Sequence, residues 1–267
     1  MRTAVTFDLW HTLIYLEPPE QEEYMHRQLE SATQVLEDSE PVPGTPRRDR
    51  AALKAAFELE LTGAVSSAAE GRSIRPEEQL ERAARSSGRV PRPQAYVRAL
   101  EKTIAETPLH LAPDALSVLG ELRDRGYALA LISNTVGEPG RLLRPALHAF
   151  GLDEYVEAYT FSDERPWAKP APEIFRETLR EIGSEPPRAI HVGDGWSDME
   201  GARRANLAGR ILYTGLQRYG ARYRELFAPP TADVVDSAYV VRALPEVVPI
   251  VERLLPVTDD ERGERGS

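Results

Sequence analysis

The sequence contains no cysteine. Disulfide bonds, thiolate metal sites and cysteine nucleophiles are therefore excluded. Long apolar runs are also missing, since none approaches the roughly 18 residues that a transmembrane helix needs. The N-terminal segment MRTAVTFDLW has no basic-then-apolar signal region and begins directly with a strand pattern. These absences favour a cytoplasmic enzyme or binding protein, although they do not strictly exclude a secreted one.

Positive charge is the scarcer kind in this chain. There are 33 basic and 43 acidic side chains, which gives a formal net charge of −10. Nucleic acids and anionic membranes both require a basic surface, so we expect neither as the main partner. A local basic pocket could still bind a small anion. The 267 residues, 41% of them hydrophobic, suffice for one sizeable domain with an insertion.

Short apolar runs that end in polar or glycine-containing loops predict buried strands. They span residues 4–7, 128–132, 156–161, 189–192, 210–213 and 232–235. Helical patterns alternate with them at residues 113–125, 141–150, 173–182, 198–206 and 244–255. This alternation predicts an α/β fold whose core, residues 1–15 and 110–257, is a Rossmann-like parallel sheet with helices on both faces. Ligands of such sheets bind at the carboxyl ends of the strands.

Residues 16–109 interrupt the alternation and contain no convincing strand. Their helical patterns span residues 20–37, 49–69, 76–86 and 94–106, separated by breaks rich in proline and glycine. We expect an inserted helical domain that returns the chain to the same sheet. The C-terminal residues 258–267 are charged and lack apolar side chains, which is typical of a disordered tail.

Polar side chains follow several of the predicted strands, namely Asp8, Ser133, Asn134 and Asp194. Asp198 lies four residues after the last of these. Lys169 precedes a helical pattern whose early Pro172 suits a helix start. One acid at a strand end has little meaning, but several polar groups at one edge of a parallel sheet indicate an active site.

The segments that contain these residues are FDLWHTL, SNT, AKPAPEIF and GDGWSD. In order and in strand context they resemble the four motifs of the haloacid dehalogenase superfamily. The resemblance covers nearly the whole chain, and the combination is far more specific than any single motif. The helical insertion resembles the cap of that superfamily and follows the first motif, as a cap usually does.

The resemblance implies a hydrolase acting on a small phosphorylated metabolite, with Asp8 as the nucleophile that forms an aspartyl-phosphate. It also implies a Mg²⁺ ion held by Asp8, by the backbone carbonyl of Trp10 and by Asp194. Asp198 would bind the metal or its waters. Mg²⁺ prefers such oxygen ligands, and its charge would let an anionic carboxylate approach an anionic phosphate.

Further roles follow from the same resemblance. Ser133 would donate a hydrogen bond to the phosphoryl oxygens, and Lys169 would add positive charge beside the nucleophile. Asn134 and Trp10 are candidate substrate-binding residues, and a purely structural role for Asn134 is equally open. Asp198 has a compatible structural role too, because residues 197–200 match a helix capping box.

Trp10 is the departure that matters. Phosphatases of this superfamily usually have a second aspartate two residues after the nucleophile, where it serves as the general acid and base. An indole cannot transfer that proton, and general acid–base catalysis is typically worth about 10²–10⁴ in rate. We therefore expect slow turnover unless another group takes its place. His11 is a candidate proton donor, although local hydrogen bonding is the more ordinary role for such a histidine.

The missing aspartate leaves two alternatives open. A catalytically impaired descendant would bind a phosphorylated ligand or a protein without turnover. A 2-haloacid dehalogenase would attack carbon, and such enzymes also resemble this chain in having an aromatic residue at the Trp10 position. Their fourth motif lacks the first carboxylate, however, whereas this chain has both Asp194 and Asp198. We therefore favour phosphorus chemistry.

Two residue groups outside the motif positions have open roles. The three tryptophans, Trp10, Trp167 and Trp196, lie in or beside the motifs and would either line an aromatic mouth or pack under the loops. Five arginines make the insertion locally basic: Arg72, Arg75, Arg82, Arg85 and Arg89. They could hold a phosphorylated substrate, but a solvated helix face is the favoured interpretation.

Overall fold

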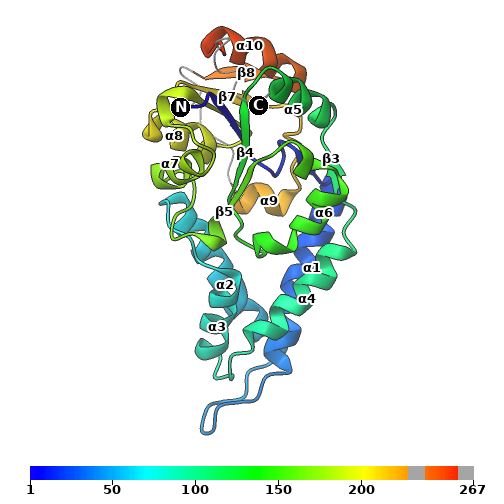
Figure 1. Ribbon diagram of the computed structural model, residues 1–267. Helices are drawn as coiled ribbons and strands as arrows, with labels where there is room; N and C mark the ends of the chain where they lie inside the picture. The colour runs from blue at the N-terminus through cyan, green and yellow to red at the C-terminus, as the bar shows by residue number, and fades with distance from the viewer. Residues whose placement is uncertain (228–237, 258–267) are drawn as a thin grey trace.

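The computed structural model describes residues 1–227 and 238–257. Its centre is a parallel six-stranded sheet, as predicted (Figure 1). In spatial order the strands are β5 (Ala158–Phe161), β4 (Ala128–Ser133), β1 (Ala4–Phe7), β6 (Ala189–Gly193), β7 (Gly209–Tyr213) and β8 (Tyr239–Val241). The order reverses around β1, and β1 and β6 lie side by side at the point where a parallel α/β sheet usually binds its ligand.

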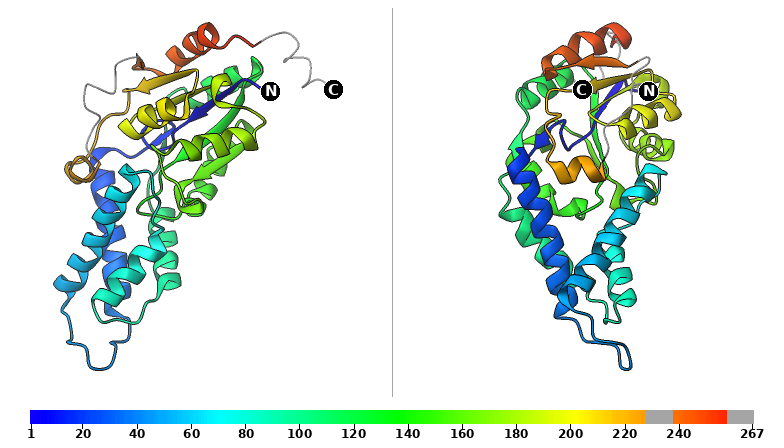
Figure 2. Two further views of the ribbon diagram at one scale, coloured as in Figure 1. Left: turned by 90° about the vertical axis from the view of Figure 1, so that its left-hand side faces the viewer. Right: turned by 180° about the vertical axis from the view of Figure 1, so that it is seen from behind.

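Helices cover both faces of the sheet because both faces of the strands are apolar. Val5 and Phe7 of β1 belong to the large core that includes side chains of α5 (Ala115–Asp124) and α10 (Val247–Leu254). Ala4 lies in a second cluster, on the face covered by α7 (Pro172–Glu181) and α8 (Trp196–Ala205). Successive residues of a strand point to opposite faces, which explains why all four residues of β1 are buried. Figure 2 shows these layers from two further sides.

The predicted strands match the observed ones to within one residue at each end, with two exceptions. The run at residues 156–161 begins as strand only at Ala158. The expected strand at residues 232–235 lies outside the described residues, as does the expected disordered tail at 258–267. The sixth strand, Tyr239–Val241, was not predicted. It pairs in parallel with β7, and three residues are too few for a strand pattern to be recognised in the sequence.

The predicted helix at residues 141–150 is divided in the structure. A 3₁₀ turn, Gly140–Leu142, comes first, and α6 (Arg144–Ala149) follows with a proline in its first turn. Proline has no backbone N–H and is tolerated only at the start of a helix, so Pro145, the second residue of α6, prevents a continuous helix from the turn into α6.

The insertion after the first strand is helical, as predicted. Its helices are α1 (Pro18–Glu37), α2 (Arg50–Ala69), α3 (Pro76–Ser86) and α4 (Pro93–Ala105). Proline begins three of them, and the Asp49 side chain caps α2 by accepting a hydrogen bond of 2.9 Å from the N–H of Ala52. Leu29, Leu53, Phe57 and other buried side chains give the helices an apolar core of their own. Figure 1 shows this helical insertion below the sheet.

Besides β8, two further strands and one short helix were not predicted. A two-stranded antiparallel pair, β2 (Ile14–Tyr15) and β3 (His110–Leu111), joins the chain where it enters and leaves the insertion. The limits expected for the insertion, residues 16 and 109, lie just inside this pair, and they remain predictions. The short helix α9 (Ala221–Leu226) lies between the sheet and the insertion (Figure 1).

Among the described residues, no helix is long and apolar enough to span a membrane.

Candidate active site

Three buried carboxyl groups meet at the carboxyl edge of the sheet. Asp8 follows β1, Asp194 follows β6, and Asp198 lies in the first turn of α8. Because β1 and β6 are paired, the ends of both strands bring their acids to the same place. One carboxylate oxygen of each residue lies within 4.8 Å of the others. The structure therefore brings together the three acidic side chains that the motifs had singled out.

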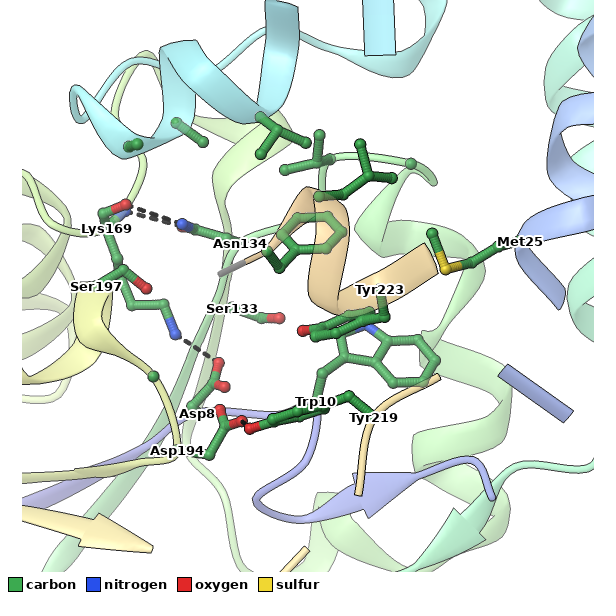
Figure 3. A pocket seen from close by; sticks show the side chains of 18 of the residues that line it. Asp8, Trp10, Met25, Ser133, Asn134, Lys169, Asp194, Ser197, Tyr219 and Tyr223 are labelled. Carbon is green, nitrogen blue, oxygen red and sulfur yellow. Dashed lines mark hydrogen bonds and ion pairs between the residues drawn. The ribbon is translucent and has the colours of Figure 1, made fainter. Parts of the chain in front are cut away.

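Lys169 connects two of these acids. Its Nζ atom lies 2.5 Å from Oδ1 of Asp8 and 2.6 Å from Oδ1 of Asp198, and it donates a third hydrogen bond to the carbonyl of Ile132. Burial lowers the pKa of Lys169, but the two carboxylates outweigh it and hold that pKa above its usual value. The lysine is therefore a buried cation. Figure 3 shows its side chain directed at Asp8.

The electrostatic balance of the cluster is negative, since three carboxyl groups share one lysine. Burial raises the pKa of Asp8 to about 6, although Lys169 opposes the change. Burial also raises the pKa of Asp194 well above its usual value, and the charges of Asp8 and Asp198 add to the effect. Asp198 alone has a pKa below the ordinary value, because Lys169 and His191 together outweigh its burial.

A divalent cation would compensate this unbalanced charge. The available donors are all carboxylate oxygens, which suits a hard ion such as Mg²⁺ better than a softer transition metal. The site therefore fits the metal that the sequence motifs implied. Asp8 and Asp194 have fewer hydrogen-bond partners than Asp198.

Asp198 is held by the protein through both carboxylate oxygens. Oδ1 lies 3.0 Å from Nε2 of His191, and Nδ1 of the same ring lies 2.8 Å from the hydroxyl of Thr6. Oδ2 accepts a hydrogen bond of 3.0 Å from the N–H of Gly195. These contacts orient Asp198 toward Lys169 and close the first turn of α8. Sequence reasoning missed His191, although its place within a buried strand next to the fourth motif was a usable signal.

The capping box expected at residues 197–200 is wrong. Helix α8 begins at Trp196, two residues earlier than predicted, so Asp198 itself is the third residue of the helix and bonds back to Gly195. Glu200 instead lies further along the helix and pairs with Arg203 and Arg204. The error arose because the predicted start of the helix was two residues late.

Ser133 ends β4 and Asn134 follows it, and the two side chains differ in their contacts. The Oγ atom of Ser133 is buried and has no hydrogen-bond partner among the described residues, although the side chain lines the cavity. An oxygen-rich ligand would satisfy it. Asn134 bonds to the backbone of Lys169, accepting 2.8 Å from its N–H and donating 2.9 Å to its carbonyl. Its amide therefore positions the lysine, and the predicted role in substrate binding stays a prediction.

The acids open into a cavity of about 630 Å³ between the sheet and the insertion. Trp10 lines it, with its ring centroid 6.0 Å from that of Tyr24 in α1. Glu138, from the loop after β4, is buried at the same wall and accepts a hydrogen bond of 2.8 Å from Gln28. Burial raises the pKa of Glu138 to about 7, while Gln28, Tyr24 and Trp10 favour its charged form. Sequence reasoning missed this acid, four residues after Asn134.

The segment around α9 also reaches the site. The hydroxyl of Tyr219 donates a hydrogen bond of 2.6 Å to Oδ2 of Asp194. Tyr223 lines the same cavity (Figure 3). The backbone N–H of Gly220 donates to the side chain of Gln21, which ties this segment to the insertion. No motif marks these tyrosines, so the sequence offered no signal for them.

His11 does not take the place of the missing acid. Its Nε2 atom lies 2.9 Å from the amide nitrogen of Gln21, and its ring packs edge-on against Tyr219 and Tyr223. Burial lowers its pKa to about 4, so the imidazole is neutral near pH 7 and has lost its acidic proton. The side chain does not line the cavity, and its role is local packing and hydrogen bonding.

The three tryptophans do not share one environment. Trp10 and Trp196 line the cavity, whereas Trp167 packs beside α7 and forms an isolated antiparallel β-bridge with Arg72.

None of the five arginines of the insertion lines the cavity. Several pair with carboxylates of the insertion or with its backbone, as Arg82 does with Glu78 at 2.6 Å. A solvated helix face describes Arg82 and Arg85 of α3, whereas Arg89 is buried and donates a hydrogen bond to the carbonyl of Ser39.

Comparison with known proteins assigns this chain to a family. The family model described as "haloacid dehalogenase-like hydrolase" matches residues 3–206, which include all four motifs. The chain belongs to this family. A crystal structure of a phosphatase of the same superfamily, from Thermococcus onnurineus, shares the fold, with a TM-score of 0.59 at 21% identity over 96% of this chain and 100% of that one.

Curated relatives resemble part of the chain. Haloacid dehalogenase-like hydrolase domain-containing protein 3 of Homo sapiens is 33% identical over 141 residues, 52% of this chain and 51% of that protein. Glyceraldehyde 3-phosphate phosphatase of Methanothermobacter thermautotrophicus is 36% identical over 107 residues, 39% of this chain and 45% of that protein. The chain thus matches about half the length of these relatives.

Proposed function

We propose that this protein is a Mg²⁺-dependent phosphohydrolase that acts on a small phosphate monoester through an aspartyl-phosphate at Asp8. The observation that carries the proposal is the buried cluster of Asp8, Asp194 and Asp198 around the cation of Lys169. This cluster faces a cavity large enough for a metabolite. A phosphatase among the partial relatives supports the same reaction class.

The reaction would proceed in two displacements. A carboxylate oxygen of Asp8 attacks phosphorus, the bond from phosphorus to the ester oxygen breaks, and the leaving oxygen takes a proton from solvent water. Water then attacks the phosphorus of the aspartyl-phosphate, which releases inorganic phosphate and restores the carboxylate. Lys169 and the hydroxyl of Ser133 would stabilise negative charge on the phosphoryl oxygens, since both lie beside Asp8 at the cavity.

The metal would be held by the side chains of Asp8 and Asp194 and by the backbone carbonyl of Trp10, with Asp198 supporting the site through Lys169 and Gly195. When bound, Mg²⁺ supplies positive charge that reduces the repulsion between the carboxylate and the phosphate. The surplus of carboxylates is also the reason to prefer phosphorus over carbon–halogen chemistry, because uncompensated acids would repel an anionic haloacid.

The test is phosphate release from a panel of phosphate monoesters, with Mg²⁺ and with a chelator. We expect turnover only with the metal, and a loss of at least about 10³-fold in Asp8→Asn, which keeps the shape of the side chain but removes the nucleophile. After a single turnover in ¹⁸O-labelled water, the label should be found in the released phosphate and not in the carboxylate of Asp8, because water attacks phosphorus.

Glu200→Gln provides the matched control, because it removes a carboxylate from α8 without touching the cluster. It should retain full activity. Substantial turnover by Asp8→Asn, or full activity under chelation, would contradict the mechanism. Binding of Mg²⁺ and phosphate without any turnover would instead identify the catalytically impaired binding protein that Trp10 suggests.

A further inference from the structure

The cavity beyond the acidic cluster has an apolar and aromatic wall. Helix α1 contributes Tyr24 and Met25, α2 contributes Leu61 and Val65, and the segment around α9 contributes Tyr223 and Phe227. Figure 3 shows Trp10, Tyr219, Tyr223 and Met25 on the side of the cavity opposite Lys169. A phosphate bound at Asp8 would therefore extend its organic part toward side chains that favour apolar and aromatic groups.

Positive charge is scarce in this cavity. Lys169 is the only lysine or arginine that lines it among the described residues. Its ammonium group is already shared between Asp8 and Asp198 at 2.5 and 2.6 Å. Arg222 lies close by in the chain, at α9, but its guanidinium pairs with Glu58 at 2.9 Å and does not line the cavity. A second anionic group on a substrate would thus be buried without a cation, which is strongly unfavourable.

Among the described residues that line the cavity, Glu138 is the one acidic or basic residue outside the cluster of Lys169 and the three aspartates. Its carboxyl group is buried, receives a hydrogen bond from Gln28 and contributes no positive charge in either protonation state. In its charged form it accepts a hydrogen bond from a neutral hydroxyl or amine and opposes the approach of a carboxylate or a second phosphate.

We infer that the substrate is a phosphate monoester whose organic part is uncharged and apolar or aromatic, and that substrates with a second anionic group are rejected. This inference rests on the proposed function, because it places the phosphate at Asp8. It goes further by assigning the wall built from α1, α2 and the segment around α9 as the subsite for the organic group.

Non-hydrolysable phosphonates test the inference without requiring turnover. The wild-type protein with Mg²⁺ would be titrated calorimetrically with methylphosphonate, phenylphosphonate and 4-carboxyphenylphosphonate. We expect phenylphosphonate to bind at least about tenfold more tightly than either of the other two. The matching phosphates, phenyl phosphate and 4-carboxyphenyl phosphate, should show the same order in kcat/KM.

A charge introduced into the wall provides the decisive variant. Met25→Lys should reduce the preference for phenyl- over 4-carboxyphenylphosphonate at least about fivefold, because it supplies the cation that the wall lacks. Leu59→Lys is the matched control, since Leu59 is 71% exposed on α2, and it should leave the preference unchanged. Both variants would first be checked for a cooperative thermal transition.

The outcomes separate the two proposals. Equal or tighter binding of the carboxylated phosphonate by the wild-type protein, or no gain from the aromatic ring over methyl, would overturn the inference about the substrate. An unchanged preference in a folded Met25→Lys would overturn the assignment of the wall as its subsite. Phosphonate binding in the predicted order without hydrolysis of any phosphate ester would leave the subsite standing and overturn the proposed catalysis.

Discussion

The side-chain amide of Asn134 holds the backbone of Lys169 on both sides, through hydrogen bonds of 2.9 Å to its carbonyl and 2.8 Å from its N–H. The two residues are 35 positions apart in the chain. Because the ammonium group of Lys169 must lie between Asp8 and Asp198, this backbone contact determines where the buried cation is located.

We therefore expect Asn134→Ala to lower kcat about tenfold while KM changes little, because the lysine is misplaced and the cavity is intact. Asn134→Asp, which keeps an acceptor for the N–H of Lys169 and loses the donor, should retain more activity than the alanine variant. Steady-state kinetics with phenyl phosphate provides the measurement. A change confined to KM would show instead that Asn134 contacts the substrate, as the sequence motif first suggested.

Tyr219 orients a proposed metal ligand, because its hydroxyl donates a hydrogen bond of 2.6 Å to Asp194. Loss of such an indirect contact typically weakens metal binding about 10–100-fold. Tyr219→Phe should therefore raise the Mg²⁺ concentration required for half-maximal activity at least about tenfold. Tyr155→Phe, which lies outside the cavity, serves as the control and should leave the metal dependence as it is.

The indole of Trp10 cannot donate the proton that a poor leaving group requires. Alkyl phosphates depend on protonation of the leaving oxygen more than aryl phosphates do, so the wild-type protein should hydrolyse them much more slowly. Trp10→Asp should raise kcat for an alkyl phosphate about tenfold relative to an aryl phosphate. Trp10→Asn, which has a similar size and no ionisable proton, should give no such rise. A fall in turnover of both substrates in Trp10→Asp would show that the indole mainly shapes the cavity.

Glu138 makes stability depend on pH. Its pKa is about 7 in the fold, against 4.5 for an exposed glutamate, so the unfolded state releases this proton at lower pH. The stability contribution is complete below about pH 4.5 and is lost as the pH rises to about 7. The difference corresponds to about 3 kcal/mol as an upper bound. In denaturant unfolding of the metal-free proteins, the free energy of unfolding of wild type should fall relative to that of Glu138→Gln as the pH rises from about 4.5 to about 7. A constant difference between the two proteins across this range would contradict the assignment.

Gly193 leaves room for the side chain of Asp198. A Cβ atom at Gly193 would lie 2.4 Å from Cγ of Asp198, so Gly193→Ala must displace the acid that holds Lys169. We expect at least about a 100-fold loss of activity together with reduced thermal stability. In Gly63→Ala, the matched control, the added methyl group has no atom within 4 Å. Because Gly63 lies within α2, that variant should be active and more stable by up to about 1 kcal/mol.

Most of the fold was predictable because its signals are local. The apolar strands, the four helices of the insertion and the polar residues after the strands all lie in short segments whose own pattern specifies them. The elements that were missed are the ones without such a pattern. Strands β2 and β3 have two residues each, and β8 has three. Helix α9 has six residues, too few for a helical period to be recognised.

The sequence by itself determined the cluster of acids, since parallel strands bring residues at their carboxyl ends to one edge of the sheet. Asp8 directly follows β1 and Lys169 lies three residues before α7, so two elements with a clear pattern bring these side chains together across 161 positions. Only the tertiary structure decided what surrounds them. Glu138, Gln28 and Tyr219 come from a loop, a helix of the insertion and the segment before α9, and their meeting depends on how these parts pack. Side-chain packing between distant elements has no local signature, so the wall of the cavity became visible only in three dimensions.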